Sequence, residues 1–347
     1  MKKVFTIGSA TMDVFVECDK ANIVSVSSKD RNSDFMSYPY GAKIDMSNFS
    51  SNVGGGGVNT AMNFSQLGYN TSAIFKIGHD IYSAGILEAF SYTKVNLDNI
   101  IQNKKISTGF SIILVSFQGD RTVLANRGAN ALITLNDINF DALKEADLLY
   151  IAPLNGESNK VLEPLVKFAH KNDIRVCFNA GTTSLKKGFN EIKKILKTSN
   201  VVVMNKDEAM MCTGIEVRPD TKTQRYSCEI IHPDIKTMLT TLKVADYQII
   251  VITDGKNGAY AYSGKKFYYC PTFPSEVVST LGAGDAFAST FCASMEKTKF
   301  DIGKSLMYAS VASSSVVSKF GATEGLIGFN KIKEKLSVKP DYTYIEV

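Results

Sequence analysis

The segment Ser279-Thr-Leu-Gly-Ala-Gly-Asp-Ala-Phe287 decides the fold, and the small and apolar residues 288–293 that follow it are typical of a compact helix. Small residues at the start of a helix let backbone N–H groups converge on an anion. The segment therefore predicts an anion site at this helix start, formed by the amides of Gly282, Ala283 and Gly284.

Asp285 comes directly after these amides, in the first turn of the same predicted helix. A carboxylate is common there, because it faces the positive end of the helix dipole. A carboxylate beside an anion site is also able to accept a proton from an attacking hydroxyl. An ordinary Asp has a pKa of about 3.9, so Asp285 is expected to be ionised at neutral pH. From this segment alone, both interpretations of Asp285 stay open.

A second glycine-rich segment, Gly54-Gly-Gly-Gly-Val-Asn59, also precedes a helical pattern, which ends at Gly68. Four glycines cost backbone entropy, so the segment is either a flexible turn or a place where bare backbone meets a polar ligand. It lacks the spacing of the dinucleotide fingerprint, which argues against an NAD-dependent oxidoreductase. A Walker-type loop is also absent, because Thr298 stands where the motif before Gly303-Lys-Ser305 requires glycine.

The composition is that of an ordinary globular protein, with 347 residues, 44% of them apolar and 21% charged. The net charge of +5 comes without a dense basic block, which argues against nucleic-acid binding. The chain has no run of about 18 apolar residues, so no membrane span is expected. Six cysteines without CxxC spacing and three histidines argue against a zinc site or a disulfide framework. This cysteine usage fits a cytoplasmic location.

Short apolar runs alternate with helical patterns along most of the chain. The runs have the length and the β-branched or aromatic content of strands that are buried on both faces. They cover residues 4–7, 73–77, 148–152, 174–178, 201–204 and 249–253. This alternation predicts an α/β fold with a mostly parallel sheet covered by helices.

Two regions interrupt the alternation, at about residues 12–50 and at residues 107–127. The second has the pattern of a β-hairpin with its turn at residues 118–120. Strands from both regions would pair into a small sheet beside the large one, an arrangement that suggests a lid over a cleft. The polar and irregular residues 218–233 are expected to form a surface insertion.

The two glycine-rich segments, in this order and spacing, resemble the two signatures of the ribokinase (PfkB) family of sugar and nucleoside kinases. Intervening matches in the same order are Asp13, Gly78-His-Asp80, Arg127-Gly-Ala-Asn130, Asn205-Lys-Asp-Glu208, Thr253-Asp-Gly255 and Gly321-Ala322. The resemblance implies one ribokinase-like domain over residues 1–347, with three layers and a mostly parallel central sheet flanked by helices. It places a small β-sheet lid at about residues 12–50 and 104–127.

The resemblance also implies a reaction, the ATP-dependent phosphorylation of an alcohol group on a small sugar, with ATP as co-substrate and Mg²⁺ as cofactor. Asp285 would be the general base, and the amides of residues 282–284 would form the anion hole. Asn205 and Glu208 are three residues apart and share a helix face; Asn205 would bind the nucleotide, and Glu208 would hold Mg²⁺ through water. Thr253 and Gly255 end a buried strand, where open α/β sheets place ligands, and would face the nucleotide.

Four residues would bind the acceptor in this family, and they are Asp13, Gly55, Gly56 and Asn59. Asp13 follows the first strand and is able to bind vicinal hydroxyls, while the glycines offer backbone contacts and the asparagine an amide. A sugar, a phosphosugar and a nucleoside all stay open as the acceptor. A non-catalytic relative that senses a sugar or a nucleotide is the alternative from another class.

Three cations near the predicted lid are Lys43, Arg121 and Arg127. They would either bind a phosphate or carboxylate of the substrate or be solvated surface charges. Ser279 stands where family members often carry an acid that helps to bind a monovalent cation, which argues against activation by K⁺. Exposed edge strands of the lid would allow a homodimer.

Overall fold

The computed structural model describes residues 2–28, 32–116, 121–186, 188–218 and 230–347. A nine-stranded sheet forms its centre, in the order β17-β16-β15-β14-β13-β12-β11-β1-β6. In chain order these strands are β1 (Lys3–Ile7), β6 (Asn70–Ile74), β11 (Leu148–Ile151), β12 (Arg175–Asn179), β13 (Val201–Asn205), β14 (Ile249–Thr253), β15 (Ala259–Tyr262), β16 (Phe267–Cys270) and β17 (Ile345–Glu346). Six neighbouring strands of this sheet, β14, β13, β12, β11, β1 and β6, run parallel, whereas β15, β16 and β17 pair antiparallel.

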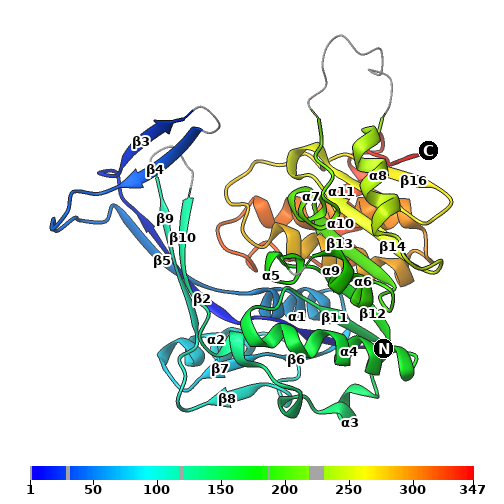
Figure 1. Ribbon diagram of the computed structural model, residues 1–347, viewed down its shortest axis with the longest axis horizontal. Coiled ribbons are helices and arrows are strands. Elements are labelled where there is room, and N and C mark those ends of the chain that lie inside the picture. Colours follow the sequence, from blue (N-terminus) through cyan, green and yellow to red (C-terminus); the bar gives the residue numbers. More distant parts are fainter. Residues whose placement is uncertain (1, 29–31, 117–120, 187, 219–229) are drawn as a thin grey trace.

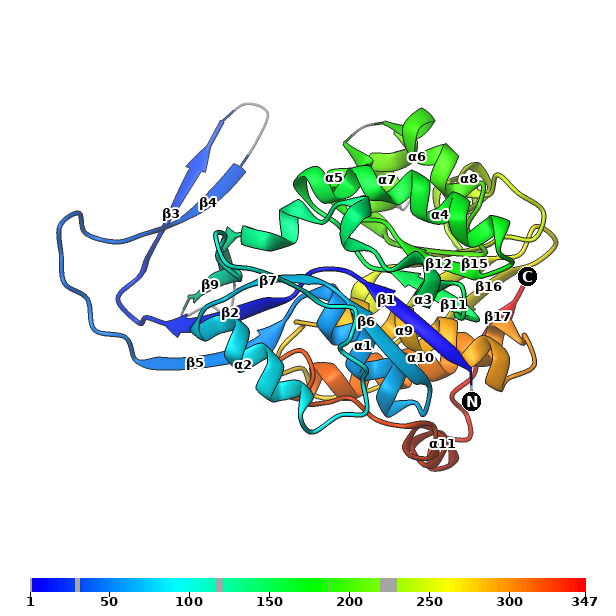
Figure 2. The ribbon, with the colours of Figure 1, turned by 90° about the horizontal axis from the view of Figure 1, so that it is seen from below.

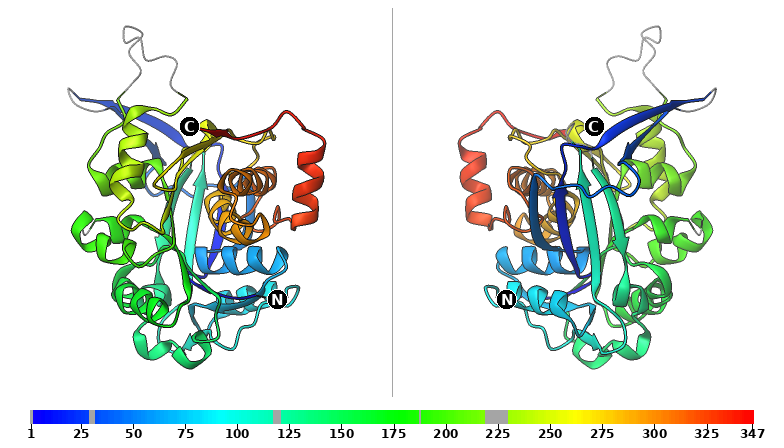
Figure 3. Two further views of the ribbon diagram at one scale, coloured as in Figure 1. Left: turned by 90° about the vertical axis from the view of Figure 1, so that its right-hand side faces the viewer. Right: turned by 90° about the vertical axis from the view of Figure 1, so that its left-hand side faces the viewer.

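Helices cover both faces of this sheet (Figure 2). One face carries α4 (Leu162–Lys171), α5 (Thr182–Leu185), α6 (Phe189–Leu196), α7 (Lys206–Thr213) and α8 (Pro233–Leu242), and the other carries α1 (Gly56–Gln66), α9 (Ala283–Lys297) and α10 (Ile302–Val317). Figure 3 shows the sheet between these two layers. Neighbouring residues of one strand pack into hydrophobic cores on opposite faces of the sheet. Val4 packs into the core on the α9 side and Phe5 into the core on the α4 side. The predicted parallel, doubly covered sheet is therefore confirmed.

The sheet differs from the prediction at residues 73–77. Strand β6 ends at Ile74, and β7 (Lys76–Gly78) leaves the central sheet to pair with β8 (Ile101–Asn103). Phe75, which is fully buried, lies between β6 and β7. The largely apolar run hid this break because all of its residues, including Lys76, are buried, whichever sheet they belong to.

A four-stranded sheet in the order β10-β9-β2-β5 projects from one end of the central sheet (Figure 1). Its strands are β2 (Thr11–Glu17), β5 (Asn48–Gly54), β9 (Gly109–Val115) and β10 (Arg121–Asn126). The predicted hairpin is β9 paired with β10, and its expected turn lies outside the described residues. A separate pair, β3 (Asn22–Ser27) with β4 (Asn32–Ser37), extends beyond this sheet. Most of the predicted insertion at 218–233 also lies outside the described residues.

Within the described ranges, no helix combines the length and the apolarity needed to cross a membrane. Parallel strands end at one edge of the central sheet, and the N-termini of α1 and α9 meet there. In open α/β sheets this edge is where ligands bind.

Candidate active site

Asp285 lies in the first turn of α9 and accepts a hydrogen bond of 2.8 Å from the Asn59 Nδ2 amide on α1. The two helices are clamped one turn further along, where Asn63 Nδ2 donates to Ser289 Oγ at 2.7 Å and to Thr290 Oγ1 at 2.8 Å. Two predicted site residues that are 226 positions apart in the sequence are thus in direct contact.

The chain enters α9 through Gly282, which has φ 73° in the left-handed region. A side chain there would also collide with the Ala322 carbonyl oxygen, 2.6 Å from the ideal Cβ position. Glycine is therefore required at this position, both for its backbone conformation and for the close approach of residue 322. This turn aims the first amides of α9 at the edge of the sheet.

Burial raises the pKa of the Asp285 carboxyl above its ordinary value, and the hydrogen bond from Asn59 opposes this rise in part. The raised pKa brings the carboxylate closer to the neutral range in which a general base works best. The carboxylate remains an acceptor for one directed N–H bond, which also fixes its orientation.

A cleft of about 220 Å³ opens in front of Asp285. Besides Asp285, its lining includes the predicted residues Asn205, Glu208, Thr253, Gly282 and Gly284. These residues come from the ends of β13 and β14, from α7 and from the start of α9. The structure therefore brings the predicted base, anion site, nucleotide residues and metal residue to one place.

A smaller hollow of about 110 Å³ adjoins this cleft and shares Thr253 and Gly284 with it. Gly255 and Ala283 line it too. Among the described residues outside its own helix turn, no heavy atom lies within 4 Å of an ideal Cβ at Gly284, so the helix start is open toward both hollows. The Ala283 N–H is less available, because it donates a long hydrogen bond of 3.4 Å to the Thr280 carbonyl.

Asn205 and Glu208 form a reciprocal cap at the start of α7. The Asn205 side chain accepts from the Glu208 N–H at 2.8 Å, and Glu208 Oε2 accepts from the Asn205 N–H at 3.0 Å. They are thus helix-start residues, and they also line the cleft. Burial, with a further contribution from Asp285, raises the pKa of Glu208 to about 7. Two partly buried carboxyl groups that line the same cleft suit a divalent cation.

Asp13 comes after the first strand, as expected, and lies inside β2, where its side chain is buried. Burial raises the pKa of this carboxyl, while hydrogen bonds from Ser111 and Thr11 lower it. Gly54 leaves room for it, since a Cβ there would lie 2.2 Å from Asp13 Oδ2.

The amides of the first glycine-rich segment already have acceptors within the protein. The Gly56 N–H donates to Ser9 Oγ at 3.2 Å, and the Gly57 N–H donates to the Ser9 carbonyl at 2.8 Å. An ideal Cβ at Gly55 would lie 2.5 Å from the same carbonyl. A ligand that binds the Gly56 amide would have to displace the Ser9 hydroxyl.

The pfkB family carbohydrate kinase model matches residues 1–327 of the chain. The chain belongs to this family. It is 26% identical over 341 residues to the ribokinase of Bacillus subtilis, covering 97% of this chain and 100% of that protein. It is also 26% identical to a bifunctional ribokinase/ribose-5-phosphate isomerase A of Fructilactobacillus sanfranciscensis, covering 94% of this chain but 54% of that longer protein.

The fold of the chain is also similar to that of ribokinases. The structure of Arabidopsis thaliana ribokinase complexed with ribose and ATP superimposes with a TM-score of 0.76 at 20% identity, covering 97% of this chain and 99% of that one. Both the predicted fold and the predicted enzyme class, a carbohydrate kinase, are confirmed.

Sequence reasoning missed two contacts of this kinase. Ser9, between β1 and β2, caps the start of α1 through its carbonyl and hydroxyl oxygens. Arg121, at the start of β10, donates from Nη1 to Thr280 Oγ1 at 2.8 Å, which joins the small sheet to the segment before α9. Neither partner is near in sequence, so no local pattern indicates these contacts.

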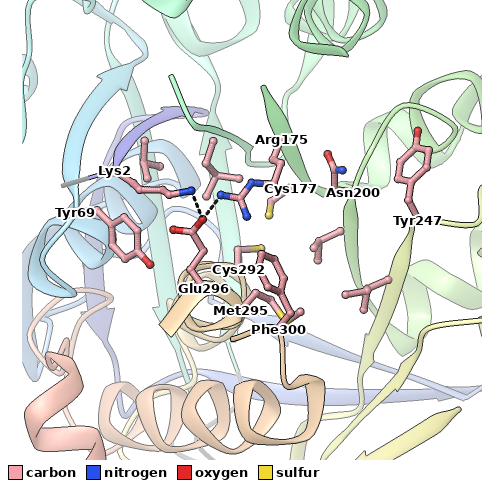
Figure 4. Close-up of a pocket in the computed structure, with 14 residues that line it drawn as sticks. Lys2, Tyr69, Arg175, Cys177, Asn200, Tyr247, Cys292, Met295, Glu296 and Phe300 are labelled. Carbon is pink, nitrogen blue, oxygen red and sulfur yellow. Dashed lines mark hydrogen bonds and ion pairs between the residues drawn. The ribbon is translucent and has the colours of Figure 1, made fainter. Parts of the chain in front are cut away.

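A separate hollow of about 130 Å³ lies at the opposite edge of the sheet (Figure 4). Lys2 and Arg175 both form ion pairs with Glu296 there, and the sulfurs of Cys177 and Cys292 lie beside them. Glu296 is eleven residues beyond the catalytic candidate on the same helix, about 16 Å along its axis. This hollow is therefore not part of the candidate active site.

Proposed function

We propose that the protein transfers the γ-phosphoryl group of ATP to a hydroxyl group of a small sugar, with Asp285 as the general base. The observation that carries this proposal is the hydrogen bond of Asp285 to Asn59 at the junction of a cleft and a second hollow. The second hollow would take the phosphates of a nucleotide, and the first glycine-rich segment adjoins the base, since an ideal Cβ at Gly56 would lie 3.4 Å from Asp285 Oδ1.

The chemistry follows from the positions of the groups. The acceptor hydroxyl gives its proton to Asp285 as its oxygen bonds to the γ-phosphorus, and the bond from that phosphorus to the leaving ADP oxygen breaks. The Gly284 amide and the dipole of α9 stabilise charge on the phosphoryl oxygens. The amides of Gly282 and Ala283 would extend this anion hole. The Ala283 N–H would first have to break its hydrogen bond to the Thr280 carbonyl.

Asn205, Thr253 and Gly255 would bind the nucleotide in the adjoining hollow. Glu208 would hold Mg²⁺ through a water molecule, and the ion would neutralise charge on the phosphates when it is bound. The ion pair of Lys206 Nζ with Asp254 Oδ1, at 2.6 Å, links the ends of β13 and β14 beneath this region.

The acceptor would lie between Asp285 and the small sheet, which acts as the lid. Asp13 would bind vicinal hydroxyls, Asn59 would bind another oxygen of the acceptor, and Gly55 and Gly56 would provide the adjoining backbone. We further propose that lid strands of two subunits meet, since Val123 and Leu124 on β10 are about half exposed. A monomer in light scattering at working concentration would end that part of the proposal. The reaction would take place in the cytoplasm.

The test is ADP release by the wild-type protein with a panel of sugars and nucleosides, followed by Asp285→Asn. A sugar should stimulate release, and the substitution should lower kcat by roughly 10²- to 10⁴-fold while ATP binding persists. The matched control is Asp141→Asn, at a carboxylate whose side chain is 92% exposed. Near wild-type turnover in Asp285→Asn removes this residue from the role, and release without any stimulating acceptor favours a sensor.

A further inference from the structure

Four buried side-chain atoms lack a hydrogen-bond partner among the described residues, and they are Asn52 Nδ2, Asn59 Oδ1, Asn63 Oδ1 and Ser294 Oγ. Leaving such a polar atom unpaired destabilises the folded protein, so each one requires an explanation. Asn59 already contacts the proposed base through its other amide atom. Asn52 belongs to no motif of the sequence, and it has no role in the proposed mechanism.

The strand register places Asn52 beside the acceptor site. In the lid, Asn52 of β5 lies directly opposite Asp13 of β2, and Asp13 lies opposite Ser111 of β9. Directly paired residues of neighbouring strands have their side chains on the same face. Asn52, Asp13 and Ser111 therefore form one polar row across three strands.

This row is on the face of the lid that looks toward the segment after α10, and the opposite face packs against α2. Side chains alternate along a strand, so Phe15 shares the face of Asp13. The Phe15 ring packs against Phe320, which follows α10, with ring centroids 4.7 Å apart. Met12, on the opposite face, lies against α2 (Ile81–Phe90), where an ideal Cβ at Gly85 would be 2.7 Å from its Cε.

The unpaired atoms differ in what they require. Asn52 Nδ2 is a donor and needs an oxygen, whereas Asn59 Oδ1 is an acceptor and needs a hydrogen. Hydroxyl groups supply both, and they also supply the hydrogens that the carboxylate of Asp13 accepts. A phosphate or a carboxylate supplies acceptors only and would be repelled by Asp13.

We propose that Asn52 is a specificity-determining residue of the kinase: its amide donates to the oxygen of one hydroxyl in a vicinal pair whose hydrogens bind Asp13. This inference rests on the proposed function, and it favours an uncharged polyhydroxy acceptor over a phosphosugar. A site with a buried donor rejects a substrate analogue that lacks the matching oxygen, because binding that analogue leaves the donor unpaired.

The experiment compares wild type, Asn52→Ala and the matched control Asn48→Ala, since Asn48 lies on the same strand and face but is exposed. The probes are the best sugar of the acceptor panel and each of its monodeoxy forms. Asn52→Ala should raise KM for the parent sugar about tenfold, with kcat and KM for ATP within about twofold. One monodeoxy sugar should be used equally well by wild type and variant, because it lacks the oxygen that Asn52 binds.

An unchanged KM for the parent sugar, or a tenfold loss that persists with every monodeoxy sugar, would overturn the proposal. Thermal unfolding separates a binding role from a structural one. Asn52→Ala removes an unpaired donor and should unfold at the same temperature or higher, whereas a structural role predicts a lower temperature. Failure here is distinguishable from failure of the proposed function, which would appear as unaltered turnover in Asp285→Asn.

Discussion

Two glycine-rich segments, residues 54–57 and residues 282–284, each lead into a helix on the same side of the central sheet. In the first segment, a Cβ at any of the four glycines would lie within 3 Å of another protein atom. In the second, Gly282 has such a neighbour, but Gly284 has none within 4 Å. The first segment is shaped by the protein that surrounds it, and the second leaves an opening.

The amides of the two helix starts differ in the same way. Ser9 accepts hydrogen bonds from the backbone N–H groups of residues 56, 57 and 58, so the first amides of α1 already have partners within the protein. At α9, within the part of the chain that the structure describes, the corresponding contact is one long bond from the Ala283 N–H to the Thr280 carbonyl. A glycine-rich helix start therefore indicates an anion site only where its amides and the space before them are both free.

The largest effect is expected from Gly57→Ala in the first segment. Its Cβ would lie 2.8 Å from the Gly8 carbonyl carbon and 2.9 Å from the Ser9 oxygen, and neither backbone atom is able to move away cheaply. The free energy of unfolding should fall by about 3 kcal/mol, at the upper end of overpacking costs. Urea denaturation measures it, and a loss below about 0.5 kcal/mol would contradict close packing as the reason for this glycine.

Gly284→Ala is the matched substitution in the second segment. The added methyl group has open space, so unfolding should stay within about 0.5 kcal/mol of wild type. The same methyl group would enter the space proposed for the transferring phosphoryl group. We expect kcat/KM to fall about thirtyfold, or about 2 kcal/mol. If both glycine variants lost stability and kept activity alike, the distinction between the segments would be wrong.

The contrast between the two segments also shows which features of the fold and the site the sequence predicts. The runs at residues 148–152, 174–178 and 201–204 predicted buried parallel strands correctly, because burial on both faces leaves a largely apolar signal. The cluster of Asp285 with Glu208 was within reach only through the resemblance of the segments to a known family. Both glycine segments consist of small residues ahead of a helix, so the difference in the space and the hydrogen bonds around them was beyond local reasoning.

What the sequence could not predict depends on contacts between distant strands and loops. The unpaired amide nitrogen of Asn52 can be connected with the proposed acceptor site only through the strand register, which sets Asn52 opposite Asp13. Asp13 follows the first strand as expected, but the strand pairing that sets it opposite both Asn52 and Ser111 has no signal in the local sequence. The caps supplied by Ser9 likewise join residues 47 positions apart.

The second segment shares its cleft with Glu208, whose raised pKa of about 7 gives a pH test. A raised carboxyl pKa favours the protonated form, so the charge that would hold Mg²⁺ is present above pH 7 and lost below it. The Mg²⁺ concentration for half-maximal rate should rise about tenfold per pH unit below 7. Glu208→Gln should raise it at every pH and flatten the profile, and a wild-type requirement that is constant between pH 6 and 8 would refute this role.

The smallest effect is expected where the lid contacts the second segment. The Arg121 guanidinium donates to Thr280 Oγ1 at 2.8 Å, on an exposed part of the molecule. Arg121→Ala should raise KM for the acceptor about threefold to tenfold, as expected for one hydrogen bond of about 1 kcal/mol. Thr280→Val removes the same bond but keeps the cation.

The pair of variants separates a lid contact from a charge effect. If the bond only holds the lid closed, the two single variants and the double variant should have the same KM, because each removes the same interaction. A larger loss of kcat in Arg121→Ala than in Thr280→Val would show that the guanidinium acts on the phosphoryl group itself. Either outcome concerns the second segment alone, since the first is held by Ser9 and has no contact of this kind with β10 among the described residues.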